Sequence, residues 1–245
     1  MISERAKKEK KEIPIVSGGA GSDIITVPSE ISCCSGIIVN GKMIKSLLFT
    51  TDIAVIMNNN ADAVFAVYPF TPHPAIFSAI MSVAQVPVFA GVGGGTTKGA
   101  RSRDMALLAE AHGCIAVVLN APAPIETFRF ITQSVICPIV ATIVSEYSNF
   151  EERIEAGASI LNISGGPKTP NIVRMIRKSH PTIPIIATGG PTGESILKTI
   201  DAGANAITYT PPSNGELFRI KMDKYREISK ENFIEGSKQE NNFST

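Results

Sequence analysis

The sequence predicts one α/β domain, a closed (β/α)8 TIM barrel, because two kinds of strand start alternate along it. In the first kind an X-Pro pair opens a short apolar run, and the examples are Val86–Ala90, Cys137–Ala141 and Ile183–Ala187. In the second kind a glycine precedes the run, and the examples are His112–Leu119, Ala156–Ile163 and Ala202–Tyr209. The spacing between Pro138 and Pro184 equals that between Gly157 and Gly203. A repeated strand–helix unit with wholly apolar strands indicates a parallel sheet covered by helices.

Eight such units follow one another after residue 45. The predicted strands are Ser46–Thr50, Ala63–Tyr68, Val86–Gly91, Ile115–Asn120, Ile139–Ile143, Ser159–Ser164, Ile183–Thr188 and Ala206–Thr210. The segments between them show helical apolar spacing, as in Ile76, Ile80 and Val83. Eight units favour a closed ring over an open doubly wound sheet.

Helix starts and stops fit this assignment. Asn149 and Thr192 are suitable N-cap residues, and Gly113, Gly157 and Gly203 stand where a helix ends in a left-handed residue. The first helix, about 52–59, is short, and residues 215–228 form the closing helix.

The glycine-rich segment 91–99 also argues against an open nucleotide-binding sheet. It follows the third strand and does not read G-x-G-x-x-G into a helix. Nor is it a Walker A loop, because Lys98 precedes Gly99 and not Ser or Thr.

The remaining segments extend the barrel at its two ends. The predicted division is a charged tail at 1–12, an N-terminal extension at 13–45, the barrel at 46–228 and a polar, frayed C-terminal tail at 229–245. Within the extension, β-like runs at 24–27 and 36–39 predict a hairpin or plug that closes the N-terminal end of the barrel.

Bulk composition limits the function classes. The chain has 245 residues, 44% of them hydrophobic, which suits one barrel. A net charge of +1 gives no electrostatic case for nucleic acid or a membrane surface as the main partner. No apolar stretch approaches the roughly 20 residues that span a bilayer, and the charged N-terminus does not resemble a secretion signal. A cytoplasmic location is therefore expected.

The cysteines and histidines do not predict a metal or cofactor. Cys33, Cys34, Cys114 and Cys137 show no C-x-x-C spacing, and the last two open strands, where buried free thiols indicate a reducing compartment. No His, Asp and Glu cluster has the spacing of a metal site. His73, alone in a proline-rich loop, is not favoured as a ligand or a base.

The candidate catalytic residues follow from the rule that barrel chemistry lies at the carboxyl ends of the strands. Asp52 and Glu146 are the carboxylates at or just after predicted strand ends, and strands 1 and 5 face each other across the mouth. The two could act as acid and base. Lys98 could polarise a carbonyl or enolate oxygen. The plain alternatives are a helix N-cap for Asp52 and solvated loop charges for Glu146 and Lys98.

The candidate binding residues are glycines and small polar groups at the same end. Glycines let backbone N–H groups face a bound anion, and a helix N-terminus adds positive charge. The predicted set is Gly93, Gly94, Asn120, Asn162, Gly165, Gly166, Gly189, Gly190, Thr210, Ser213 and Asn214. The alternative for the glycines is a tight turn without a ligand.

Segments 183–190 and 201–207 resemble the phosphate-binding barrels of the ribulose-phosphate-binding type. Within that group the chain looks most like small aldolase, epimerase and glycerol-phosphate-responsive barrels, in its second half only. The resemblance implies a phosphate site in the loops after strands 7 and 8. Thr210-Pro211-Pro212-Ser213 departs from the usual Gly-Ser, and strand 6 carries Asn162 where a Schiff-base aldolase needs lysine.

Together these features predict an enzyme of lyase, aldolase, isomerase or epimerase type. It would move a proton next to the carbonyl of a small phosphorylated or carboxylated metabolite, with an anionic small molecule as its partner. One alternative is a barrel that senses such a ligand without turnover, favoured by the few ionisable groups at the mouth. The other is a small-molecule hydrolase, for which no nucleophile–base pair is evident. A homo-oligomer is left open.

Overall fold

The computed structural model describes residue 14 and residues 24–242, with the backbone alone for 234–242. Eight parallel strands close into a ring in the order β10-β3-β4-β5-β6-β7-β8-β9. Their bounds are β3 (Ser46–Phe49), β4 (Ala63–Ala66), β5 (Val88–Gly93), β6 (Ala116–Leu119), β7 (Ile139–Ile143), β8 (Ile160–Ile163), β9 (Ile185–Thr188) and β10 (Ala206–Tyr209). All eight predicted strands are present, so the barrel is confirmed. The predicted charged tail at 1–12 lies outside the described residues.

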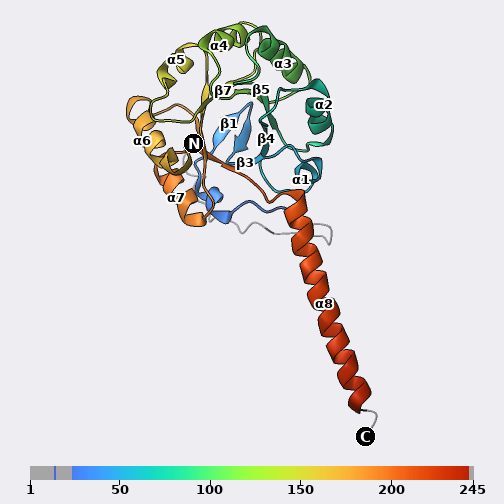
Figure 1. Cartoon of the computed structure of the whole chain (residues 1–245). Helices are drawn as coiled ribbons and strands as arrows, with labels where there is room; N and C mark the ends of the chain where they lie inside the picture. The colour runs from blue at the N-terminus through green and yellow to red at the C-terminus, as the bar shows by residue number, and fades with distance from the viewer. Residues whose placement is uncertain (1–13, 15–23, 243–245) are drawn as a thin grey trace, which may run out of the picture.

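The helices form an outer layer around the strands (Figure 1). They are α1 (Ile53–Met57), α2 (Pro74–Val83), α3 (Ala100–Ala111), α4 (Ile125–Thr132), α5 (Phe150–Glu155), α6 (Thr169–Ser179) and α7 (Gly193–Asp201), with a 3-10 turn, η4 (Gly166–Lys168), before α6. Asn149 and Thr192 cap α5 and α7 as predicted. One apolar cluster fills the space between helices and sheet, and a second fills the barrel interior.

A hairpin plugs the N-terminal end of the barrel. It consists of β1 (Ile37–Val39) and β2 (Lys42–Ile44), joined by Asn40 and Gly41 with φ of 47° and 79°. These positive angles are those of the two-residue hairpin turn that Asn-Gly favours. Ile37, Val39 and Ile44 belong to the interior cluster.

The pairing of the hairpin differs from the prediction in one respect. Residues 24–27 are not one of its strands, because Ile25 instead pairs with Asn59 beside α1. Ile25 and Val27 pack there against Leu48 and Val55. The N-terminal segment thus covers the outer face of β3, and a 3-10 turn, η3 (Ser29–Cys33), packs on α7.

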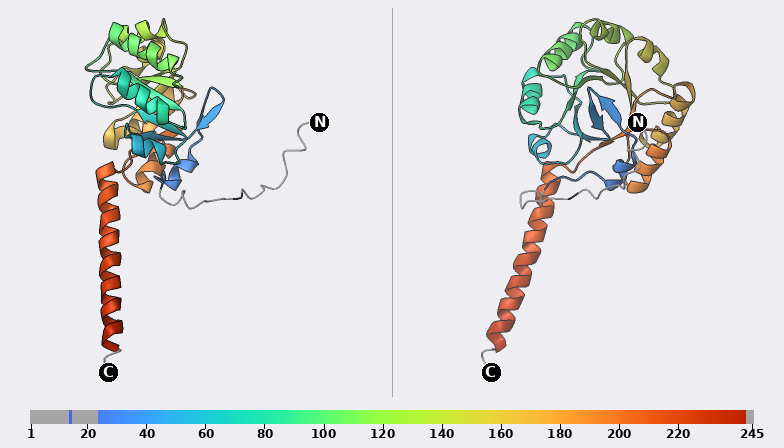
Figure 2. Two further views of the ribbon diagram at one scale, coloured as in Figure 1. Left: turned by 90° about the vertical axis from the view of Figure 1, so that its right-hand side faces the viewer. Right: turned by 180° about the vertical axis from the view of Figure 1, so that it is seen from behind.

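The last helix, α8 (Asn214–Asn242), does not fold back onto the sheet. It projects away from the barrel in all three views (Figures 1 and 2). The predicted frayed tail from residue 229 is wrong, since the helix continues to Asn242; residues 229–242 contain no proline and a single glycine, so nothing in them stops a helix. Phe218, Ile220 and Tyr225 are more than half exposed. No helix in the described part of the chain is long and apolar enough to span a membrane.

Gly157 offers a test of the helix-stop glycines. It has φ of +109°, and a Cβ there would lie 2.3 Å from Thr132 Oγ1, which is held by the carbonyl of Ala156. We expect Gly157→Ala to destabilise the fold by about 1–3 kcal/mol. The matched control is Gly113→Ala, at φ +84° with no atom within 4 Å of the added Cβ. This variant introduces the backbone strain without a steric clash. Urea unfolding should give the smaller loss for Gly113→Ala, and equal losses would contradict the steric account.

Candidate functional site

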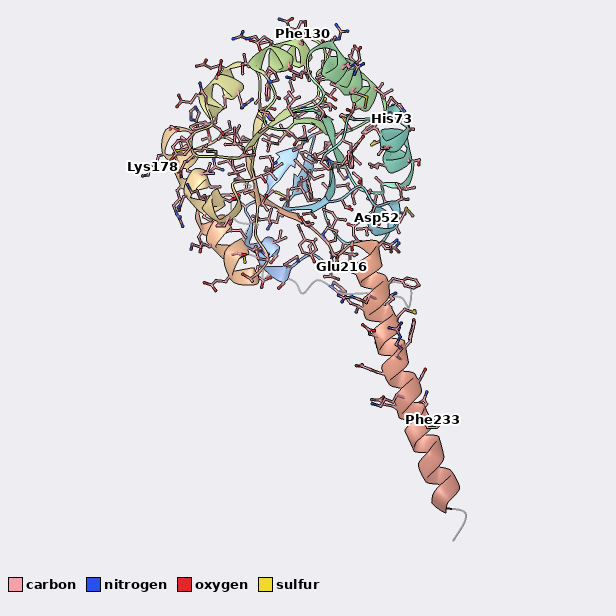
Figure 3. All side chains as sticks on the ribbon, viewed as in Figure 1. Asp52, His73, Phe130, Lys178, Glu216 and Phe233 are labelled. Carbon is pink, nitrogen blue, oxygen red and sulfur yellow. The ribbon has the colours of Figure 1, made fainter. Side chains whose placement is uncertain are left out.

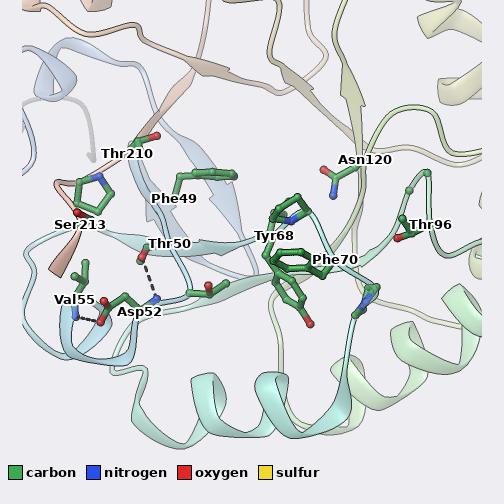
Figure 4. Close-up of a pocket in the computed structure, with 18 of the residues that line it drawn as sticks. Phe49, Thr50, Asp52, Val55, Tyr68, Phe70, Thr96, Asn120, Thr210 and Ser213 are labelled. Carbon is green, nitrogen blue, oxygen red and sulfur yellow. Dashed lines mark hydrogen bonds between the residues drawn. The ribbon is translucent and has the colours of Figure 1, made fainter. Parts of the chain in front are cut away.

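A cavity of about 800 Å³ opens at the carboxyl end of the barrel strands (Figure 4). The loops after β3, β4, β5, β6 and β10 surround it. Its lining includes Phe49, Thr50, Asp52, Val67, Tyr68, Phe70, Gly91, Gly93, Gly94, Gly95, Thr96, Asn120, Thr210, Ser213 and Glu216. Of the predicted site residues, it therefore brings together Asp52, Gly93, Gly94, Asn120, Thr210 and Ser213.

The top layer of the barrel interior is polar on one side and apolar on the other. Each strand from β7 to β10 carries a polar residue two positions after a residue of the interior cluster. Those interior residues are Val140, Ile160, Ile186 and Ala206. The polar residues are Thr142, Asn162, Thr188 and Thr208, and Asn120, directly after β6, continues the arc. Because side chains alternate along a strand, these groups face inward near the mouth. The opposite half of the layer carries Phe49 and Val67.

Hydrogen bonds link three members of this arc. Asn162 Nδ2 donates to Thr142 Oγ1 at 3.3 Å, and Thr142 Oγ1 donates to Asn120 Oδ1 at 3.3 Å. The Asn120 Nδ2 group is thereby left to donate toward the cavity. Asn162 Oδ1 is buried without a hydrogen-bond partner among the described residues. A buried acceptor without a donor costs free energy, and Asn162 itself lines neither cavity of the described residues.

Asp52 lines the cavity and also caps α1. Its Oδ1 accepts from Ala54 N at 2.9 Å and Val55 N at 3.2 Å, while its own N–H donates to Thr50 Oγ1. The N-cap alternative is thus confirmed as a structural role. Oδ2 has no hydrogen-bond partner within the described residues, so one oxygen of the carboxylate remains for chemistry in the cavity.

Glu216 is a second carboxylate at this cavity, and sequence reasoning missed it. Its Oε2 accepts from Ser213 N at 2.8 Å and Ser213 Oγ at 2.7 Å, while Glu216 N donates to Ser213 Oγ. The spacing Ser213-x-x-Glu216 is a capping box and could have identified it. Figure 3 shows Glu216 at the N-terminal end of α8, on the same side of the barrel as Asp52.

The capping bonds from Ser213 hold the pKa of Glu216 below its usual value. A depressed carboxyl pKa stabilises the fold above the ordinary pKa of Glu, and this contribution is lost as the pH falls through the folded-state pKa. The charge of Glu216 is therefore present at the mouth throughout the neutral range.

Carboxylate side chains of the protein also lie near the loops after β9 and β10, where the resemblance implies a phosphate site. A second cavity of about 560 Å³ there is lined by Gly190, Thr192, Gly193 and Glu216. A Cβ on Gly193 would lie 2.2 Å from Glu30 Oε1, so the Glu30 carboxylate lies against the first turn of α7. With Glu216 at the start of α8, both helix N-termini at this corner already have an anion beside them.

Other predicted residues lie elsewhere. Glu146 Oε1 forms an ion pair with Lys168 Nζ at 2.9 Å, and this contact lowers the pKa of Glu146. A carboxylate with a lowered pKa is a weaker base. Neither Glu146 nor Lys98, which is exposed, lines either cavity of the described residues. His73 caps α2 by accepting from Ala75 N, so its observed role is structural.

Several predicted glycines serve packing in the described structure. A Cβ on Gly165 would lie 2.4 Å from Ile172 Cδ1, and one on Gly189 would lie 2.8 Å from both Ile196 and Ile207. Gly166 and Asn214 line neither cavity. Close packing against these isoleucines is therefore a reason for glycine at positions 165 and 189 that needs no ligand.

Sequence reasoning also missed the aromatic wall. Phe49 stands two residues after the interior residue Leu47, and Tyr68 and Phe70 follow β4. The Tyr68 hydroxyl accepts from His73 N at 2.8 Å, which fixes the ring at the mouth. Strand alternation could have placed Phe49 inside, but loop conformation decides where Tyr68 and Phe70 lie.

No protein-family model matches the chain, and no curated protein matches it in sequence. Solved structures do match in fold. A phosphonopyruvate hydrolase bound to oxalate and Mg²⁺ is 15% identical with a TM-score of 0.56, covering 85% of this chain and 88% of its own. A phosphoenolpyruvate phosphomutase from Streptomyces platensis subsp. rosaceus is 12% identical with a TM-score of 0.54, covering 78% and 83%. Dihydrodipicolinate synthase from Bacillus anthracis is 17% identical with a TM-score of 0.53, covering 67% and 69%. Similarity at this level establishes the shared barrel fold alone.

Among the described residues, no group of three or more His, Cys, Asp and Glu side chains could hold a metal ion. The ionisable side chains that line the main cavity are Asp52, Tyr68 and Glu216. The mouth is therefore acidic, with an aromatic wall and a neutral polar floor.

Proposed function

We propose that the chain is a lyase- or isomerase-type enzyme that moves a proton next to the carbonyl of a small carboxylated metabolite. The observation that carries the proposal is the Asp52 carboxylate, which lines a cavity with an apolar wall and the Asn120 amide on its floor. A base and a neutral hydrogen-bond donor that line the same cavity suit enolate formation.

In the proposed step, Asp52 Oδ2 takes the proton from the carbon next to the carbonyl. Negative charge then develops on the carbonyl oxygen, which would accept a hydrogen bond from Asn120 Nδ2. The backbone N–H groups of Gly95 and Thr96, which have no acceptor among the described residues, could hold the carboxylate. Phe49 and Phe70 would cover the apolar part of the molecule and keep water from it.

We favour a carboxylated substrate over a phosphorylated one because of the charge at the mouth. Glu30 and Glu216 already lie at the starts of α7 and α8, and Asp52 adds a third carboxylate nearby. A doubly charged phosphate would be repelled by these groups. Phosphonopyruvate and phosphoenolpyruvate, which stand in the names of two structural neighbours, each carry a carboxylate and a phosphorus group, so the preference rests on the charge at the mouth alone.

The experiment is proton exchange in D₂O, followed by ¹H NMR, with pyruvate and 2-oxobutyrate as probes. Turnover should remove the signal of the protons next to the carbonyl faster than buffer alone. Binding without exchange, seen as a thermal shift, would instead support the ligand-sensing alternative, which the few ionisable groups at the cavity favour. If no 2-oxo acid either binds or exchanges its protons, the proposed substrate class is wrong.

Removal of the Glu216 charge should let phosphate bind. In Glu216→Ala the start of α8 loses its internal anion, so we expect affinity for inorganic phosphate to rise at least about tenfold, or ~1.4 kcal/mol. Isothermal titration at fixed ionic strength measures this. The control is Glu231→Ala, which removes the same charge from an exposed position far along α8. An equal gain in both variants would show a net-charge effect and contradict the local explanation.

A further inference from the structure

Two cysteine thiols lie together at the end of the barrel opposite the mouth. Cys114 precedes β6 and is 7% exposed, and Cys137 precedes the neighbouring β7 and is partly exposed. Both are free. Neither lines the main cavity, so the proposed function makes no use of them.

The end of α3 holds both cysteines in place. Cys114 N donates to the carbonyl of Ala109 at 3.1 Å. Glu110 Oε1 accepts from the backbone N–H groups of Ile136 and Cys137, each at 2.7 Å. Two successive residues of one helix therefore anchor the two cysteine backbones, which restricts how far the thiols can separate.

The strand register brings the same two residues to one level. Val117 of β6 lies opposite Ile139 of β7, so Cys137 is level with residue 115, one residue from Cys114. Neighbouring strands lie about 4.8 Å apart, within the range of Cα separations that a disulfide spans. Each thiol shifts the pKa of the other, so the two sulfur atoms lie near each other.

The two thiols differ in reactivity and access. The neighbouring Cys114 thiol lowers the pKa of Cys137, and the Cys137 thiol, together with burial, raises the pKa of Cys114. Ile136, beside Cys137, is 97% exposed, so this edge of the molecule is open to solvent. Cys137 is thus the thiol that a soluble oxidant can reach as a thiolate, and Cys114 is the one placed behind it.

We propose that Cys114 and Cys137 form a reversible disulfide by exchange with a low-molecular-weight disulfide. The Cys137 thiolate attacks one sulfur of the small disulfide, which forms a mixed disulfide and releases one small thiolate. The Cys114 sulfur then attacks the Cys137 sulfur, forms the protein disulfide and expels the second small thiolate. The two protein thiols are oxidised, the small disulfide is reduced to two thiols, and the two protons pass to these products.

The full chain is incubated with oxidised glutathione, blocked with iodoacetamide and digested with trypsin. Cleavage at Arg129 separates peptide 104–129, which holds Cys114, from peptide 130–153, which holds Cys137. Cys33 and Cys34 share a third peptide, 12–42, so each product is distinguished by mass. We expect the linked pair 104–129/130–153 as the main product from folded protein, at least tenfold above its yield from urea-unfolded protein.

Variants separate the two steps. Cys114→Ser should keep glutathione on Cys137, and Cys137→Ser should lose the reaction at both positions. Cys33→Ser, the control at an exposed cysteine elsewhere, should leave the linked product unchanged. A stable glutathione adduct on Cys137 in the unsubstituted protein, or equal linkage in folded and unfolded protein, would overturn the proposal. Circular dichroism of each variant establishes that the barrel is intact.

Discussion

Asp52→Asn should lower the rate of proton exchange into a bound 2-oxo acid by about 10²- to 10⁴-fold, the range that a positioned general base contributes. The substitution removes the basic oxygen and leaves the shape of the side chain. Asn is as good an N-cap as Asp, so the bonds to Ala54 and Val55 persist and α1 should keep its first turn. The loss is therefore expected in the exchange rate and not in the unfolding midpoint.

The matched control is Glu146→Gln, which makes the same chemical change in the other carboxylate expected from the sequence. Because Glu146 pairs with Lys168 and lies off the cavity, its exchange rate should stay within about twofold of the unsubstituted protein. NMR exchange and a thermal melt of both variants give the comparison. If Glu146→Gln loses exchange while Asp52→Asn retains it, the assignment of the base is wrong.

The barrel could be predicted because its signals are local. Each strand carries its own apolar run and its own start, and Asn149 and Thr192 cap helices by bonds within a few residues. The strands of the hairpin and the direction of the last helix were predicted less accurately. Asn40-Gly41 is the local turn signal for the hairpin, whereas Ile25, Val27 and Leu217 of α8 pack together beside Leu48 and Val55 through contacts that are distant in sequence.

The site was predicted in part for the same reason. Asp52 and Asn120 could be predicted as site residues from their positions at strand ends, because the carboxyl ends of all eight strands meet at one mouth. Position alone could not show that Lys168 neutralises Glu146, since that pair joins two different loops. Nor could it show that Glu30, from the N-terminal segment, lies at the start of α7.

Phe89→Ala should destabilise the fold by about 3–5 kcal/mol, a larger loss than that expected for Gly157→Ala. Phe89 is fully buried in the barrel interior, and its ring lies 6.1 Å from that of Phe65, which lies 6.2 Å from Phe49. Truncation leaves a void among strands that hydrogen bonds hold in a closed ring. The surroundings cannot collapse into it, so the full cavity cost remains.

The control for Phe89→Ala is Phe130→Ala, an identical truncation at a half-exposed position on α4, where about 1 kcal/mol or less is expected. Urea unfolding should shift the midpoint of Phe89→Ala far below that of Phe130→Ala. Phe49 is the last of the three neighbouring rings Phe89, Phe65 and Phe49, and it also lines the cavity. Phe89→Ala should therefore also weaken the binding of 2-oxobutyrate more than Phe130→Ala does. Equal unfolding midpoints for the two variants would mean that the barrel interior is not the packed core on which the position of the mouth depends.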